Sequence, residues 1–103
     1  MKIIFFWLLF SYTLTFAKNN WLGEWIALDQ WQSEFSIKIS KDGTATSNYG
    51  NGESGSWKII DGNLEIIWNS GKSDYFFQGV MGYQRIRKER EKSYTSGLMK
   101  SSN

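Results

Sequence analysis

Hydrophobic and polar residues alternate along the middle of this chain with the two-residue period of half-buried β-strands. The clearest run has Phe35, Ile37 and Ile39 separated by polar side chains. The pairs Asp42-Gly43 and Asp61-Gly62 punctuate the runs, because glycine adopts the positive φ that tight hairpin turns require. Strands are therefore predicted at residues 23–28, 34–40, 44–49, 56–60, 63–68, 74–80 and 83–87.

Six or seven short strands at spacings of about ten residues predict an all-β fold, a small antiparallel up-and-down meander. The chain has no proline to blunt exposed strand edges. Closure into a barrel, or strong curling of the sheet, is then the expected way to satisfy those edges. Gly79 and Gly82 allow a bend between the last two predicted strands. We favour a small barrel over an open sheet or a sandwich.

The first 17 residues depart from this pattern and have the organisation of a signal peptide. Lys2 supplies a positive charge, Ile3–Phe10 is apolar throughout, and Ala17 is a small residue at the expected cleavage point. An uncleaved anchor and a buried core helix are the alternatives, but the segment is shorter than the roughly 17–25 residues that span a membrane. We expect a signal-peptide helix, cleavage after Ala17, and a secreted or periplasmic product without a stable membrane anchor.

The remaining chain is predicted to form a single domain at residues 18–88, followed by a flexible basic tail at residues 89–103. Residues 18–84 hold five lysines and eight acidic residues, whereas residues 85–103 hold six basic and two acidic residues. The basic end is expected to be solvated, with contact to an anionic surface such as a membrane face or nucleic acid as the alternative. The chain has no cysteine, so the exported domain must rely on its core rather than on disulfides.

The most specific local pattern is Gly23-Glu24-Trp25, with a second copy at Gly55-Ser56-Trp57. Glycine lets the chain bend into the strand, and the indole can plug one end of a barrel. Arg85 and Arg87 share one face of the last predicted strand, and a guanidinium packs favourably across an indole. This combination resembles the calycin superfamily of lipocalin-like barrels, in which an Arg or Lys of the last strand covers the Gly-x-Trp tryptophan. The resemblance implies such a barrel over residues 21–88, with Arg85 or Arg87 across Trp25.

Neither histidine nor cysteine is present, which excludes Ser-His-Asp and Cys-His catalysis and structural zinc sites of the usual kind. Two carboxylates remain a possible acid–base pair. We expect them to be solvated, on outward strand positions or in loops, and we predict no catalytic residue, metal site or cofactor. A small carboxylate-dependent hydrolase is kept as an alternative. The carboxylates considered are Glu24, Asp29, Glu34, Glu53, Glu65 and Asp74.

Aromatic residues are the remaining candidates for function. Trp21 and Trp31 lie near predicted strand ends beside Asn and Gln residues, and Phe76 lies in an aromatic run. Exposed indoles suit stacking on a sugar or anchoring in a partner's pocket, although packing at the barrel rim is the alternative. We predict a monomeric, non-catalytic binding module that recognises a protein, a glycan or a small apolar molecule through these three residues. Nucleic acid is not an expected partner.

Overall fold

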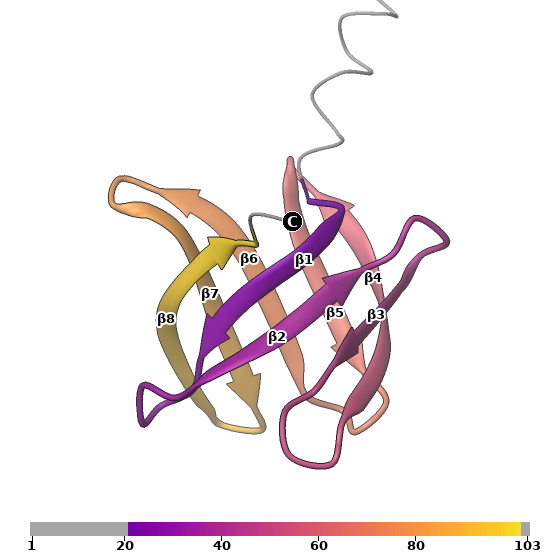
Figure 1. Ribbon diagram of the computed structural model, residues 1–103, viewed down its shortest axis with the longest axis horizontal. Helices are drawn as coiled ribbons and strands as arrows, with labels where there is room; N and C mark the ends of the chain where they lie inside the picture. The colour runs from indigo at the N-terminus through magenta and orange to yellow at the C-terminus, as the bar shows by residue number, and fades with distance from the viewer. Residues whose placement is uncertain (1–20, 102–103) are drawn as a thin grey trace, which may run out of the picture.

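The computed structural model describes residues 21–101, which form a closed antiparallel barrel (Figure 1). Each strand pairs with the next along the chain, and the last strand returns to pair with the first. The predicted all-β meander is confirmed, with eight strands rather than six or seven, and its architecture is that of calycin-like barrels in general. The predicted signal peptide, residues 1–17, lies outside the described residues. The strands are β1 (Gly23–Leu28), β2 (Glu34–Ile39), β3 (Thr44–Ser47), β4 (Glu53–Ile60), β5 (Asn63–Trp68), β6 (Ser73–Gly79), β7 (Gly82–Glu89) and β8 (Lys92–Lys100).

Alternation and turn chemistry account for most strand boundaries. β1 and β5 begin and end where the hydrophobic pattern predicts. In β2, the inward row Phe35, Ile37 and Ile39 is buried, as its alternation requires. Asp61 and Gly62 both have positive φ, 53° and 83°, and join β4 to β5 in a tight turn.

The C-terminal residues correct the prediction of a flexible tail at 89–103. Residues 92–100 form β8, which pairs with β7 on one side and with β1 on the other. Only Leu98 of this strand belongs to the buried apolar core, so its sequence carries little of the alternation that marks the other strands. It is held in place because β1 and β7 would otherwise present open edges. The barrel domain therefore continues to Lys100 instead of ending at residue 88.

A cluster of aromatic side chains fills the end of the barrel where β1 begins. Trp25 packs against Trp21, Phe76 and Tyr83, with ring centroids 5.5, 5.9 and 5.0 Å away. The two indole nitrogens are satisfied: Trp25 Nε1 donates to the Trp21 carbonyl oxygen at 2.9 Å, and Trp21 Nε1 donates to the Gly62 carbonyl oxygen at 2.8 Å. Large aromatic side chains thus plug this end of the barrel.

Gly55 has a different role from the one its sequence pattern suggests. It lies within β4, opposite Trp68 of β5. A Cβ atom added to Gly55 would lie 2.3 Å from the Ile67 carbonyl oxygen and 2.9 Å from Trp68 Cα. Glycine is therefore needed for the close approach of two backbones, rather than to bend the chain as it enters the strand.

Replacing Gly55 with alanine is expected to lower the free energy of unfolding by about 1–3 kcal/mol, because the backbones of β4 and β5 must separate to admit the methyl group. Gly97→Ala is the matched control, since an added Cβ at this β8 position meets nothing within 4 Å. We expect the control to change stability by less than about 0.5 kcal/mol. Urea denaturation of both variants is the measurement, and equal effects would contradict the steric explanation.

Removing residues 92–103 is expected to abolish cooperative unfolding, because it exposes the edges of β1 and β7 and opens the interior to water. Thermal unfolding followed by circular dichroism measures this loss. A chain that lacks only residues 102–103 serves as the control and should unfold as the full chain does. A cooperative transition in the chain that lacks residues 92–103 would show that β8 is dispensable for closure.

Candidate functional site

The other end of the barrel lies opposite the start of β1 and the end of β8 (Figure 1). It carries a groove with charged lining residues, and we call it the polar mouth. It is formed by the connections at residues 29–33, 48–52, 69–72 and 90–91. Beneath it, three charged side chains point into the barrel: Asp74 from β6 and Arg85 and Arg87 from β7, which are 1%, 0% and 2% exposed. The expectation of a solvated carboxylate is wrong for Asp74, because alternation in β6 puts it in the same inward row as Phe76. It is also wrong for Asp29, which is 6% exposed because it accepts hydrogen bonds within its own loop.

The carboxylate of Asp74 organises this buried cluster. Its Oδ1 accepts hydrogen bonds from Arg85 Nη1 at 2.7 Å and from Arg87 Nε at 3.0 Å. Its Oδ2 accepts from Trp68 Nε1 at 2.8 Å and from Arg87 Nη2 at 3.1 Å. Burial acts to lower the pKa of Arg87, but the hydrogen bonds and charge of Asp74, with the charge of Glu53, raise it overall. Arg87 is therefore held as a cation inside the barrel.

Arg85 ties the cluster to the walls of the barrel. Its Nη2 donates to the Leu28 carbonyl oxygen at 2.6 Å and to the Tyr94 hydroxyl at 3.3 Å. The guanidinium carbon lies 5.1 Å from the ring centroid of Phe35 and 5.4 Å from that of Tyr94. Contacts with β1, β2, β6 and β8 thus hold one arginine, so the cluster braces the barrel across its interior.

Neither arginine covers Trp25, contrary to the expectation drawn from the family resemblance. Lys100 of β8 takes that place, with its Nζ 4.6 Å from the Trp25 ring centroid. The same nitrogen donates to the Leu22 carbonyl oxygen, and burial lowers its pKa. The reason is topological: β8, and not the strand that carries Arg85 and Arg87, is the last strand and lies beside β1.

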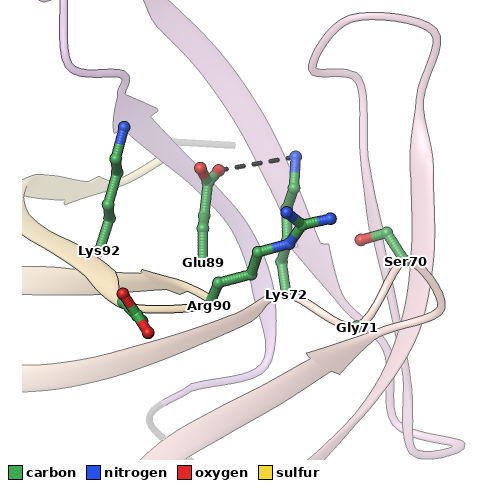
Figure 2. Close-up of a pocket in the computed structure, with 7 residues that line it drawn as sticks. Ser70, Gly71, Lys72, Glu89, Arg90 and Lys92 are labelled. Atoms are coloured by element: carbon green, nitrogen blue, oxygen red, sulfur yellow. Dashed lines mark ion pairs between the residues drawn. The ribbon is translucent and has the colours of Figure 1, made fainter.

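A groove opens at the polar mouth between the β5–β6 connection and the β7–β8 turn (Figure 2). Its volume is about 910 Å³. Glu89 links it to the buried cluster, since its carboxylate lies 3.4 Å from Arg87 Nη1 and 3.6 Å from Lys72 Nζ. Arg90, which has a positive φ of 54°, extends along the groove toward Lys72. The lining residues are Ser70, Gly71, Lys72, Glu89, Arg90, Glu91 and Lys92.

Trp31 is the predicted binding residue that the structure leaves exposed. It is 71% exposed and lies in the β1–β2 connection, at the polar mouth. Asp29 shapes this loop: its Oδ1 accepts hydrogen bonds from the backbone amides of Trp31 at 2.9 Å and Ser33 at 2.8 Å. The Tyr49 hydroxyl donates to Asp29 Oδ2 at 3.3 Å, and burial together with the Asp29 charge raises the pKa of Tyr49. The exposed indole is therefore carried by a hydrogen-bonded loop.

Trp21 and Phe76, the other two predicted binding residues, are buried in the aromatic plug. Their ring centroids lie 6.2 Å apart, and Trp21 precedes β1 whereas Trp31 follows it, at the other end of the barrel. Alternation in β6 turns Phe76 inward and leaves Tyr75 and Phe77 on the outer face. The structure thus separates the three predicted residues and does not form the expected aromatic patch.

The cations of the groove were missed as site residues in the sequence. Their signal is the charged run at residues 85–92, but such a run predicts a solvated chain end unless the strand that follows it is recognised. In the barrel, the residues of this run have two different environments. Arg85 and Arg87 point into the interior, whereas Arg90 and Lys92 line the groove. One charged segment therefore supplies both the interior cluster and the rim.

Asp74→Asn is expected to lower the free energy of unfolding by about 3–5 kcal/mol, because two buried guanidiniums lose their carboxylate. The matched control is Glu65→Gln, which breaks the surface ion pair with Lys58 (3.6 Å). That pair is solvent-exposed, so its loss should cost about 0–1 kcal/mol. Chemical denaturation measures both, and a small effect at Asp74 would show that the interior pairing contributes little.

The polar mouth carries charged groups, hydrogen-bonding groups and one exposed indole. Within residues 21–101, no group of three or more His, Cys, Asp or Glu side chains is placed to hold a metal ion. No helix in that part of the chain is long and apolar enough to cross a membrane. Comparisons with protein-family models, with curated proteins and with solved structures gave no match to this chain. The case for a function rests on the geometry of the mouth itself.

Proposed function

We propose that this chain is an exported, non-catalytic binding module of the lipocalin-like kind, which recognises a protein or a glycan at its polar mouth. The observation that carries the proposal is Trp31, an indole 71% exposed on a hydrogen-bonded loop at the end that also holds the charged groove. Tryptophan is among the residues that dominate binding energy at interfaces, and it stacks on sugar rings. An exposed indole on a hydrogen-bonded loop, at the same end of the barrel as a charged groove, suits a recognition surface.

Carriage of a small apolar molecule is less well supported. The interior of an eight-stranded barrel has room for its own side chains or for one small ligand. Here Trp25, Trp68 and Phe76 are among the largest fully buried side chains, and the polar half is occupied by the hydrogen-bonded Asp74 cluster. A ligand inside the barrel would have to displace these groups, so recognition at the surface is favoured.

The hydrolase alternative is also less well supported. Acid–base hydrolysis needs a carboxylic acid kept neutral in apolar surroundings beside a second carboxylate. At the polar mouth, Glu53 and Glu89 each lie 3.4 Å from an Arg87 nitrogen. Both are engaged by a cation and neither lies in an apolar pocket. We therefore favour binding without catalysis.

Two features of the sequence support the remaining parts of the proposal. Residues 1–17 have the organisation of a signal peptide, which favours a secreted or periplasmic location. A lysine of the last strand across the Gly-x-Trp tryptophan supports the lipocalin-like kinship. The earlier alternative of a free basic tail is replaced, since residues 92–100 are paired on both sides and Arg90 and Lys92 belong to the groove.

Trp31→Ala in the full chain is expected to weaken binding at least about tenfold, the usual loss at an interface tryptophan. Binding is measured by capture from the envelope fraction or culture fluid and, for glycans, on an immobilised glycan panel. Met99→Ala is the matched control, because Met99 is 63% exposed on the outer wall of β8. Trp31→Phe should keep part of the affinity through its ring. Equal binding by the Trp31→Ala and Met99→Ala variants would refute a role for the polar mouth.

A further inference from the structure

The β6–β7 hairpin ends in two apolar residues that contact almost nothing. Val80 is 103% exposed and Met81 is 89% exposed. Turns usually carry Gly, Asn, Asp or Ser, whose backbone and side-chain properties suit them. Here Gly82, with φ of 117°, meets the conformational demand of the turn, so neither Val80 nor Met81 is required for it. Folding gives no reason for a branched and a long apolar side chain at this tip.

The place of the tip in the molecule suggests what it contacts. It lies at the end of the barrel where residues 1–20 join the described chain at Trp21, opposite the polar mouth (Figure 1). Those preceding residues include the apolar run Ile3–Phe10. In a chain that keeps this run, a bilayer that holds it is tethered to the barrel at Trp21, at the same end as the Val80-Met81 tip.

The other connections at this end indicate an apolar rather than an electrostatic contact. Lys41-Asp42 in the β2–β3 turn carries both signs, and Asp61 lies in the β4–β5 turn. Hydrogen bonds from the Thr44 hydroxyl and amide lower the pKa of Asp42, which keeps it charged. The end is thus not a basic patch, and it carries two almost fully exposed apolar side chains at the tip.

We propose that the Val80-Met81 tip inserts into the interfacial layer of a phospholipid bilayer. The barrel then rests on the membrane by its aromatic-plugged end, and the polar mouth points away from the lipid. Two apolar side chains give a weak, reversible contact, which adds to the attachment that residues 1–17 provide while they remain in the chain. The proposal does not depend on what the polar mouth binds.

The test uses the absence of cysteine from the chain, which allows single labels. Met81→Cys and, at the polar mouth, Ser70→Cys are each labelled with an environment-sensitive fluorophore in the full chain. Each is mixed with phosphatidylcholine vesicles that contain a lipid-attached quencher. We expect a blue shift and at least about threefold stronger quenching at position 81 than at position 70, with no effect of added salt. Val80→Asp in the Met81→Cys background should remove most of that quenching.

Three results would overturn the proposal. The first is no quenching at position 81, or equal quenching at positions 81 and 70. The second is quenching at position 81 that Val80→Asp leaves unchanged. The third is a blue shift without vesicles that grows with protein concentration, which would assign the tip to contact with a second copy of the chain. Since both tip residues are exposed, circular dichroism should show unaltered folding in every variant.

Discussion

Pairing of β8 with β1 is the contact on which the rest of this structure depends. It removes the two free edges, at β1 and β8, that an open eight-stranded meander would keep, and it encloses an interior that side chains must fill. The chain has no cysteine, so no disulfide can replace this closure. The register that matches Trp25 with Lys100 also brings the lysine over the indole. The β1–β8 pairing therefore both closes the sheet and covers one end of the barrel.

The enclosed interior is filled in two different ways, so the two ends of the barrel differ in chemistry. Around Trp25, aromatic rings pack edge to face and their polar atoms find backbone partners. Around Asp74, one carboxylate accepts four hydrogen bonds from two guanidiniums and an indole. Desolvation offsets much of the attraction in such a cluster, so its main effect is to make any single replacement costly. Charge at one end and apolar groups at the other suit two different kinds of contact.

Local sequence was sufficient to predict the bounds of strands that have one face in the barrel interior and the other toward solvent. β1 and β5 follow their alternation from first residue to last, and the shared face of Arg85 and Arg87 was correctly predicted. Their partner was not, because Asp74 meets Arg87 only through the β6–β7 register. β8 was missed for a related reason: its residues are mostly polar, and neighbours from β1 and β7 hold it in the sheet.

The two-residue period, the tight turns and the lack of disulfides could be predicted from the sequence, because they depend on residues adjacent in the chain or on composition. Closure of the barrel determines which cation covers Trp25, and which of Trp21, Trp31 and Phe76 reaches solvent. Burial of Trp21 requires Phe76 and Tyr83, which are distant in sequence and are brought to it by closure of the barrel. Trp31 has similar polar neighbours in the sequence, yet it stays exposed because no strand crosses over its loop. Exposure is a property of the closed barrel, and alternation along one strand cannot specify it.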